Sequence, residues 1–475
     1  MELLRGYQVV TEERERALLV TDVRGSILNK ISTRQATVAV IGLGYVGLPL
    51  GVALAESGLR VVGIDIDARR VSSLNAGQSY IPDVPAERLS ALLANTAPNG
   101  HGQSAVYQSS LSLGSFYATT QWDILHDADA VIICVPTPVS DAKDPDLSYI
   151  VSAVDEIAPR VHQGMLVVLE STTYPGTTEE VALPRLEQSG LKVGVDFFLA
   201  FSPERIDPGR TDWTVRTTPK VVGGMTPACL EVTCALYACA VERVVPVSNP
   251  KTAEMVKLLE NTFRAVNIGL ANEMAIMCDY LDIDVWEVIE AARSKPYGFM
   301  PFYPGPGLGG HCIPVDPLYL SWKLRSFNYN ARFIQAASEI NLNMPHYVRD
   351  KIAEALNEDG RALNGSRVVL LGVAYKPNVG DVRESPALDL IHLLRERRAD
   401  VVYHDPYVPS VRIDGETISS IVLDPEALLQ ADCVVIATDH DSYDWTWIVN
   451  HSRLVVDTRN ATQGISSPAG RVVKL

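Results

Sequence analysis

One cysteine of this chain, Cys312, stands in a setting that favours chemistry over packing. It follows the glycine-rich run GPGLGG of residues 305–310, with His311 beside it and Asp316 four residues later. Glycines let a backbone approach a ligand where a side chain would block it, and a thiol near a helix start has a stabilised thiolate. We therefore expect Cys312 to act as a nucleophile. Two alternatives stay open: Asp316 is only the N-cap before Pro317, or His311 is a metal ligand, although no partner cluster for it is visible.

A second chemical signature is the turn GLGYVG of residues 42–47. It directly follows the strand pattern TVAVI of residues 37–41 and opens an apolar helix. In a dinucleotide fingerprint, Gly42 would make the bend, Gly44 would let the backbone meet the pyrophosphate, and Gly47 would let helix and strand pack closely. The phosphates would then rest on the helix N-terminus. The alternative is a tight turn that binds nothing.

Asp65 follows at the end of the next strand, where a carboxylate accepts hydrogen bonds from ribose hydroxyls and repels a 2′-phosphate. This favours NAD over NADP, with Arg69 and Arg70 nearby as the counter-argument. More cofactor contacts are expected where the strands of residues 130–135 and 165–169 end, because α/β sheets bind ligands at that edge. The expected cofactor contacts are Gly42, Gly44, Tyr45, Val46, Gly47, Asp65, Thr137, Pro138 and Thr172.

Two further candidates lie in the middle of the chain. Apolar residues recur every three or four positions along residues 251–281, which predicts a long helix. On it Lys257 and Asn261 share a face, although taken alone Lys257 is as well explained by a solvent-facing position. Glu204 lies in the proline-bounded turn SPERIDPG of residues 202–209, where a carboxylate could activate water. Taken alone, that turn is also explained as a polar loop.

The last third of the chain repeats the pattern of the first. The segments RVVLL-Gly372, DVVYHD and ADCVVI follow the order of TVAVI-Gly42, RVVGID and ADAVII. We expect a second nucleotide-binding-type sheet there. Its turn lacks the three glycines, so a nucleotide is expected rather than a dinucleotide pyrophosphate.

Composition narrows the class of protein. A chain of 475 residues predicts two or three domains. The formal charge of −16 argues against nonspecific nucleic-acid binding. The chain contains no apolar run of the roughly 18 residues that span a bilayer, and its acidic start lacks the order of a signal peptide. Seven scattered cysteines without a CxxC pair predict neither zinc nor disulfides and fit a reducing cytoplasm.

Several motifs succeed one another from about residue 36 onwards: VIGLGYVGLPL, VPTP, ESTTYPGT, SPERIDPG, AEMVKLLENTFRAVNIGLANE, GPGLGGHCIPVDP and GVAYKPNVGDVRESPALDL. In this set the chain resembles the UDP-sugar 6-dehydrogenases, whose best-known members are the UDP-glucose dehydrogenases. The resemblance implies an α/β fold of two Rossmann-like doubly wound sheets joined by a long central helix or helical linker domain. It also implies NAD-dependent oxidation of a sugar C6 alcohol to a carboxylate, through a cysteine thiohemiacetal and thioester.

The resemblance also implies roles for single residues, and no metal site is expected. The family's nucleophile falls on Cys312, with its aspartate on Asp316. Its lysine and asparagine fall on Lys257 and Asn261, and its first glutamate on Glu204. The implied substrate contacts are Glu204, Arg205, Lys257, Asn261, Gly309, Tyr375, Lys376 and Arg383.

Two departures from the family pattern bear on the substrate. The second glutamate of UDP-glucose enzymes falls on Pro208, and a threonine of those enzymes falls on Val139. Both argue against UDP-glucose. Together with the KPYGFMPFYPGPGLGGHCIPVDP segment, they resemble most the UDP-N-acetylglucosamine 6-dehydrogenase branch. UDP-N-acetylmannosamine, UDP-N-acetylgalactosamine and UDP-glucose remain alternative substrates.

The resemblance also predicts the organisation of the chain. The expected parts are an N-terminal extension of unknown role, an NAD domain, a central helical domain with the dimer surface and the cysteine loop, and a UDP-sugar domain; these span residues 1–32, 33–222, 223–345 and 346–475. A cytoplasmic homodimer or higher homo-oligomer is expected, with no membrane or nucleic-acid partner.

Two rival functions remain. A hydroxyacid or hydroxyacyl-CoA dehydrogenase shares the plan of Rossmann domain followed by helices, but it needs no cysteine and makes one NADH per turnover. A catalytically inactive regulator that binds NAD and a UDP-sugar is the other. Counting NADH per substrate separates the first rival, and the complete set of candidate catalytic residues speaks against the second.

Overall fold

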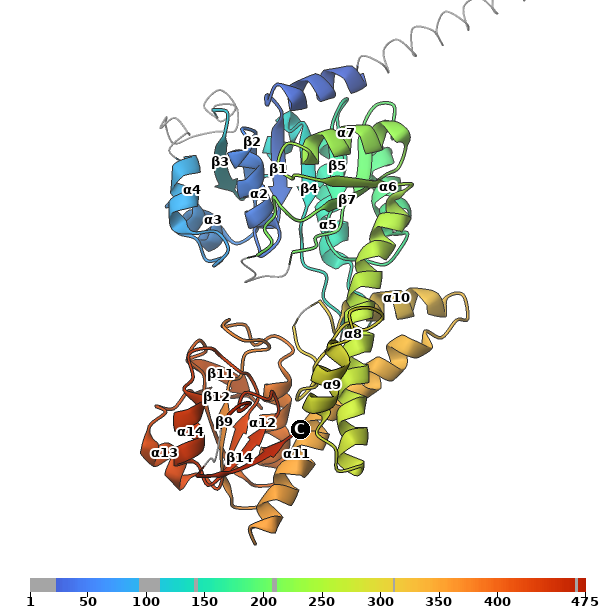
Figure 1. Cartoon of the computed structure of the whole chain (residues 1–475). Coiled ribbons are helices and arrows are strands. Elements are labelled where there is room, and N and C mark those ends of the chain that lie inside the picture. The colour runs from blue at the N-terminus through green and yellow to red at the C-terminus, as the bar shows by residue number, and fades with distance from the viewer. Residues whose placement is uncertain (1–22, 94–111, 141–143, 207–211, 311, 466–468) are drawn as a thin grey trace, which may run out of the picture. The chain divides into compact units, whose positions relative to one another are not determined.

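The computed structural model describes residues 23–93, 112–140, 144–206, 212–310, 312–465 and 469–475. The predictions made for residues 1–22, His311 and Pro208 lie outside these ranges. The chain divides into two compact units, Met1–Leu258 and Leu259–Leu475. Each unit is built around its own mainly parallel sheet, which confirms the predicted α/β fold class (Figure 1).

The first unit contains, in its described residues, an eight-stranded sheet of order β3-β2-β1-β4-β5-β6-β7-β8. All neighbours are parallel except β6 and β7. The chain reverses direction across the sheet between β1 and β4, which is the topological switch point where such sheets bind ligands. The strands are β1 Thr37–Ile41, β2 Arg60–Ile64, β3 Ser115–Thr119, β4 Ala130–Ile133, β5 Leu166–Leu169, β6 Phe198–Phe201, β7 Lys220–Gly224 and β8 Val244–Val247.

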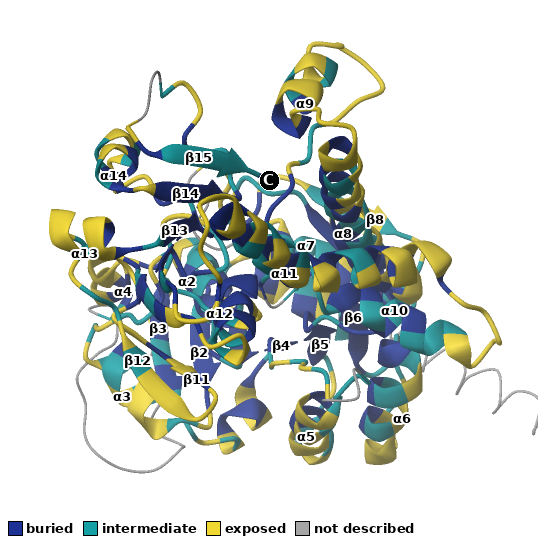
Figure 2. Cartoon of the chain, turned by 90° about the horizontal axis from the view of Figure 1, so that it is seen from below, coloured by how far each residue is buried: buried dark blue, intermediate teal, exposed yellow. Residues whose placement is uncertain are grey.

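Alternation along the strands fills two separate layers of core. Val38 and Val40 of β1 pack with α2 and α7 on one face, whereas Ala39 and Ile41 pack with α5 and α6 on the other. Figure 2 shows β4, β5 and β6 in the dark blue of buried residues, while α5 and α6 keep exposed outer surfaces. The helices of this unit are α2 Gly47–Glu56, α3 Ala68–Asn75, α4 Ala86–Leu93, α5 Ser148–Ile157, α6 Leu183–Leu186 and α7 Pro227–Tyr237.

The second unit repeats the central part of this topology. Its five-stranded sheet has the order β10-β9-β13-β14-β15 and is parallel throughout. The three repeated sequence segments are therefore equivalent strands, with β9, β10 and β13 in the places of β1, β2 and β4. Its strands are β9 Arg367–Leu371, β10 Asp400–His404, β13 Cys433–Ile436, β14 Leu454–Asp457 and β15 Arg471–Lys474, and a hairpin of β11 Ser410–Ile413 and β12 Glu416–Ser419 is added.

Helix α8, Pro250–Tyr280, begins in the first unit and continues into the second. Its extent agrees with the helix predicted for residues 251–281. The first sheet runs beyond residue 222, the domain end drawn from the sequence, because β7 crosses that position and β8 follows it. The remaining helices are α9 Val285–Arg293, α10 Asp316–Arg325, α11 Arg332–Glu358, α12 Pro386–Glu396, α13 Pro425–Gln430 and α14 Trp445–His451. No helix in the described ranges combines the length and apolarity needed to cross a bilayer.

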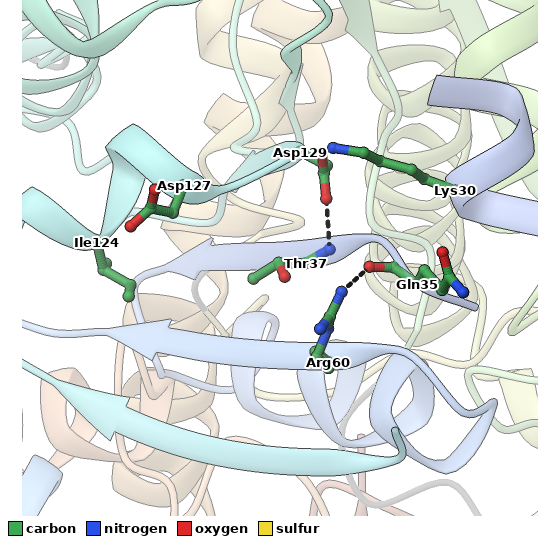
Figure 3. A pocket seen from close by; sticks show the side chains of 7 residues that line it. All are labelled: Lys30, Gln35, Thr37, Arg60, Ile124, Asp127 and Asp129. Atoms are coloured by element: carbon green, nitrogen blue, oxygen red, sulfur yellow. Dashed lines mark hydrogen bonds and ion pairs between the residues drawn. The ribbon is translucent and has the colours of Figure 1, made fainter. Parts of the chain in front are cut away.

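A helix over residues 23–32 belongs to the first unit's core, although no role for this extension is predicted from sequence. Ile27 and Ile31 are almost fully buried and join the core layer of β1 and α2. Lys30 donates to the Asp129 carboxylate at 2.6 Å, and the same carboxylate accepts the N–H of Thr37 at 2.9 Å. These groups line a hollow of about 230 Å³ at the amino end of β1 (Figure 3), whereas the glycine turn follows the carboxyl end of that strand.

We expect Ile31→Ala to lower the free energy of unfolding of the first unit by about 2–5 kcal/mol, because it removes buried methyl groups and leaves a cavity. The measurement is the midpoint of chemical denaturation. Ser26→Ala, an exposed position on the same helix, is the matched control. Equal midpoints for the two variants would mean that the helix does not belong to the cooperative core.

Candidate active site

The glycine turn between β1 and α2 has the shape of a pyrophosphate cradle. Gly42 has φ +89°, and a Cβ there would lie 2.6 Å from the Cys134 carbonyl oxygen. A Cβ at Gly47 would collide with the Gly42 carbonyl oxygen, so strand and helix meet at backbone distance. A Cβ at Gly44, in contrast, would meet nothing within 4 Å, which leaves open space beside the N-terminus of α2. The residues present therefore fit a bound dinucleotide.

Asp65 stands beyond the end of β2 and braces this turn. Its carboxylate accepts the N–H of Leu43 at 3.0 Å and the N–H of Asp67 at 2.9 Å. Arg70 lies 3.6 Å from the same carboxylate and over the ring of Tyr80. Arg70 is therefore a weaker argument for NADP, because it is paired with Asp65, the acid that would repel a 2′-phosphate.

The other predicted cofactor contacts lie along the same edge of the sheet. Tyr45 and Val46 form the turn itself, Thr137 and Pro138 follow β4, and Thr172 follows β5. All are at the carboxyl ends of strands around the switch point, where ligands bind in sheets of this kind.

Glu204 follows β6 and is tied into a buried charged cluster. Its Oε2 lies 3.3 Å from the Lys220 ammonium, which also donates to Glu170 Oε2 at 2.9 Å. Tyr237 donates to the other oxygen of Glu170. The Glu204 Oε1 accepts the N–H of Ile206 at 2.6 Å, so both carboxylate oxygens are held.

The cluster keeps Glu204 ionised. Burial works to raise the pKa of its carboxyl, but the charge of Lys220 and the Ile206 N–H outweigh burial and hold that pKa below its ordinary value, with Lys257 adding to the effect. In Glu170, on the other hand, burial dominates and raises the pKa of the carboxyl. A carboxylate that is ionised and fixed in position has the properties of a general base.

Lys257 and Asn261 lie on the buried face of α8, with 8% and 6% of their surface exposed. The solvent-facing alternative for Lys257 is therefore wrong. Lys257 contributes its charge to the electrostatics of Glu204 within the first unit. Asn261, one turn later, lies in the second unit, which begins at Leu259.

In the second unit, Cys312 lies directly before α10 and is half-buried. Its carbonyl oxygen accepts the N–H groups of Val315 and Asp316 at 3.1 and 2.8 Å. The N-cap of α10 is Val315, so Asp316 is the first helical residue and not the cap. Its carboxylate is buried and accepts a hydrogen bond from the Asn261 amide.

The glycines before Cys312 bring two parts of the chain together. A Cβ at Gly309 would lie 2.8 Å from Tyr375 Cβ and 2.9 Å from the Glu384 carbonyl oxygen. The N–H of Gly310 donates to the Arg383 carbonyl oxygen at 3.1 Å. The close approach is thus to the turn after β9, which couples the cysteine loop to the second nucleotide-type sheet.

That second turn is braced as the first one is. Asp405, at the end of β10, accepts the N–H groups of Val373 and Ala374 at 2.7 and 3.1 Å. Its second partner is His440, fully buried, at 3.1 Å. Burial works against ionisation, but the His440 and backbone hydrogen bonds outweigh it and lower the pKa of the Asp405 carboxyl.

The predicted nucleotide contacts sit on this turn and on the segment that follows it. Tyr375 and Lys376 lie together, with the ammonium 5.7 Å from the ring centroid, and Arg383 is ion-paired with Asp381. Arg205, predicted as a substrate contact, lies in the other unit and donates to the Pro219 carbonyl oxygen at 2.7 Å.

Sequence reasoning missed two cations, of which Lys220 is buried and Arg459 is half-buried. Lys220 begins β7, which is antiparallel to β6, so its amino end reaches the carboxyl edge of the sheet. Arg459 follows β14 and lies against Gly305 in the second unit; burial lowers the pKa of its guanidinium. Arg459 could have been predicted, because it follows the carboxyl end of a parallel strand, where such sheets bind ligands. Lys220 gives no such signal, because it stands at the amino end of β7, which is antiparallel to β6.

Among the described residues, His, Cys, Asp and Glu side chains form no group that could hold a metal ion. His311 lies outside that search.

Three models of the UDP-glucose/GDP-mannose dehydrogenase family match the chain. The NAD binding domain matches residues 36–241, the central domain residues 251–343 and the UDP binding domain residues 369–464. A UDP-N-acetyl-D-mannosamine dehydrogenase of Pyrococcus horikoshii is 36% identical over 89% of this chain and 95% of its own length. An NDP-N-acetyl-D-galactosaminuronic acid dehydrogenase of Ralstonia solanacearum is 34% identical with the same coverage. The solved structure of a UDP-D-ManNAc dehydrogenase from Pyrococcus horikoshii has a TM-score of 0.80 at 34% identity, over 92% of this chain and 99% of that one.

Proposed function

We propose a reaction from one premise: this chain belongs to the UDP-glucose/GDP-mannose dehydrogenase family and is an NAD-dependent UDP-sugar dehydrogenase. The proposed reaction is the four-electron oxidation of the C6 alcohol of a UDP-N-acetylhexosamine to the uronic acid. Bound NAD⁺ supplies the hydride acceptor for each of the two oxidations. The turn at residues 42–47 and Asp65 would hold it.

The residues of this chain would handle protons and the reacting carbon. A water held by Lys257 and Asp316 takes the hydroxyl proton in the first oxidation. The Cys312 thiol then adds to the aldehyde carbon, which retains it as a thiohemiacetal. After the second oxidation the carbon is a thioester, and Glu204 takes a proton from the water that attacks it. Carbon–sulfur cleavage releases the acid and the Cys312 thiolate.

The observation that carries the proposal is the buried hydrogen bond between Asn261 and Asp316, four residues after Cys312. Burial of a carboxylate is costly unless it is hydrogen-bonded or paired, and Asn261 supplies such a bond to Asp316. Here the carboxylate orients an amide that is suited to stabilise an oxyanion at a carbon bound to sulfur. Lys257, buried on the same helix face, is the second donor of this kind.

The proposed substrate is N-acetylated because two sequence positions depart from the UDP-glucose pattern. Pro208 replaces a glutamate, and Val139, half-buried beside Pro145, replaces a threonine. The relatives named above act on N-acetylmannosamine and N-acetylgalactosamine derivatives by their names. The sequence resemblance favoured the N-acetylglucosamine epimer, which those names do not support, so all three epimers belong in the test.

The test is an NADH absorbance assay with UDP-N-acetylglucosamine, UDP-N-acetylmannosamine, UDP-N-acetylgalactosamine and UDP-glucose. We expect two NADH per molecule of one N-acetylated sugar, a uronic acid product, and a kcat/KM for UDP-glucose at least about tenfold lower, which corresponds to about 1.4 kcal/mol. One NADH per turnover would contradict the thioester route. A preference for UDP-glucose would contradict the substrate class.

A homodimer in the cytoplasm is part of the proposal. Apolar side chains of α8 are exposed in the single chain, as is Phe333 of α11, and an exposed apolar helix face is typical of a protein–protein contact. The large apolar side chains exposed on α8 are Met255, Leu259, Phe263, Leu270, Met277 and Tyr280.

A further inference from the structure

The charged cluster around Glu204 contains a lysine to which neither the motifs nor the reaction assigns a role. Lys220 is 6% exposed and begins β7. Its ammonium is shared between two carboxylates, at 2.9 Å from Glu170 and 3.3 Å from Glu204. Such burial of a lysine is costly unless charges pair with it. Together the three residues form the Lys220 cluster.

The antiparallel pairing of β6 and β7 places Lys220 beside Glu204. Phe201 of β6 pairs with Gly223 of β7 in antiparallel register. Continued three residues beyond Phe201 and three residues before Gly223, this register brings Glu204 opposite Lys220. Between them, Ser202 donates to the Val221 carbonyl oxygen at 2.8 Å. The position of the ammonium is therefore set by the sheet.

The two carboxylates differ in their other partners. Glu170 is fully buried and receives the Tyr237 hydroxyl as well as Lys220. Glu204 is 13% exposed and receives two backbone N–H groups on Oε1, from Arg205 and Ile206. Of the pair, Glu204 alone has access to solvent, so it is the one that can meet a water molecule.

We propose that Lys220 is a positioning residue that holds Glu204 as an ionised carboxylate in one orientation, ready to take a proton from water. Glu170 and Tyr237 hold the ammonium from its other side. The role of Glu204 in taking a proton from water rests on the proposed function. The effect of Lys220 on the ionisation of Glu204 rests only on their contact.

The groups facing Glu204 act in opposite directions. Removing the Lys220 charge should raise the pKa of the Glu204 carboxyl, because burial raises this pKa and the Lys220 charge is the largest effect that lowers it. An opposite charge at this distance lowers a carboxyl pKa by about 1–3 units, so the loss is expected to raise it by at least about one unit. The titratable and charged groups that face Glu204 are Lys220 of β7, Glu170 after β5, Lys257 of α8 and Cys134 after β4, while Tyr237 of α7 faces Glu170.

The experiment compares Glu170→Gln with Glu170→Gln/Lys220→Met, because these two proteins differ only in the lysine. Glutamine replaces Glu170 in both proteins because removal of Lys220 would otherwise leave the buried Glu170 carboxylate without its cation. Lys220→Arg is the conservative variant. Folding is checked by the thermal midpoint and by NAD affinity.

The first measurement is an infrared titration of Glu204, its band assigned by comparison with Glu204→Gln, and it needs no turnover. The pKa of Glu204 should be higher by at least about one unit in the double variant than in Glu170→Gln. In Lys220→Arg, which keeps the positive charge, the Glu204 titration should stay at the wild-type value. An unmoved titration in a folded double variant overturns the proposal, whatever the enzyme does with sugars.

The second measurement is pre-steady-state NADH formation with the substrate found in the panel. If Lys220 acts through Glu204, only thioester hydrolysis slows. The double variant should then release two NADH per site in a burst and continue at least about tenfold more slowly, with the acid limb of kcat displaced to higher pH. Equal slowing of both oxidations, with no burst, contradicts this role. Absence of NADH from the wild-type enzyme would instead refute the proposed function and leave the infrared result standing.

Discussion

Replacing Cys312 with serine is expected to lower steady-state formation of the uronic acid by about 10³-fold or more, because a nucleophile that acts with its partners as one unit carries most of the rate. The hydroxyl is a poorer nucleophile than the thiolate and does not retain the aldehyde in the same way. NADH formation should stop after the first oxidation or before the acid is released. The measurement is NADH and acid per molecule of substrate at saturating NAD⁺.

Cys234→Ser is the matched control, since this cysteine is also half-buried but lies in α7. It should retain wild-type turnover. Trapping with iodoacetamide gives a second readout, because substrate should protect Cys312 from the reagent. Full acid production by Cys312→Ser would remove the thiol from the reaction.

Lys257→Met should reduce kcat by about 10²–10³-fold while KM changes little, because an oxyanion donor acts in the transition state more than in the ground state. Methionine keeps the length of the buried side chain and removes only the charge. The acid limb of the pH profile should also move upward, since the Lys257 charge helps to hold the pKa of Glu204 low. Below the folded-state pKa of Glu204 the base is protonated, so activity is lost as pH falls through that value.

Lys251→Met is the control on the same helix. Lys251 is half-exposed and paired with Glu179, so its loss should leave kcat within about twofold. A Lys257→Met enzyme with wild-type kcat would assign the buried lysine to packing.

Much of the fold followed from local pattern. The strand TVAVI followed by Gly42 and an apolar helix defines a βαβ unit, because positive φ and close helix packing are properties of the glycines themselves. The same rule located the second sheet, since its strands repeat the order of the first. Cys312 and Asp316 are predicted as site residues because the glycines and prolines around them are strong local signals.

Other features depended on contacts between distant segments. The period of α8 predicted a helix, but it misled about its faces: Leu259 and Phe263 of the apolar stripe are exposed, whereas Lys257 and Asn261 are buried. Periodicity marks where apolar residues recur and not which partner covers them. The helix of residues 23–32 was left without a role for the same reason, because burial of Ile31 comes from β1 and α2.

By itself, then, the amino-acid order determined the strands, the glycine turns and the cofactor and predicted a nucleophilic thiol, because each of these depends on backbone freedom or side-chain chemistry within a few residues. Only the tertiary structure decided that Asp316 accepts from Asn261 and that Lys220 faces Glu204. The first contact spans 55 positions of sequence, and the second arises because β7 runs antiparallel to its neighbour β6, although it is parallel to β8. Strand direction is set by the packing of the whole sheet, which no short stretch of residues encodes.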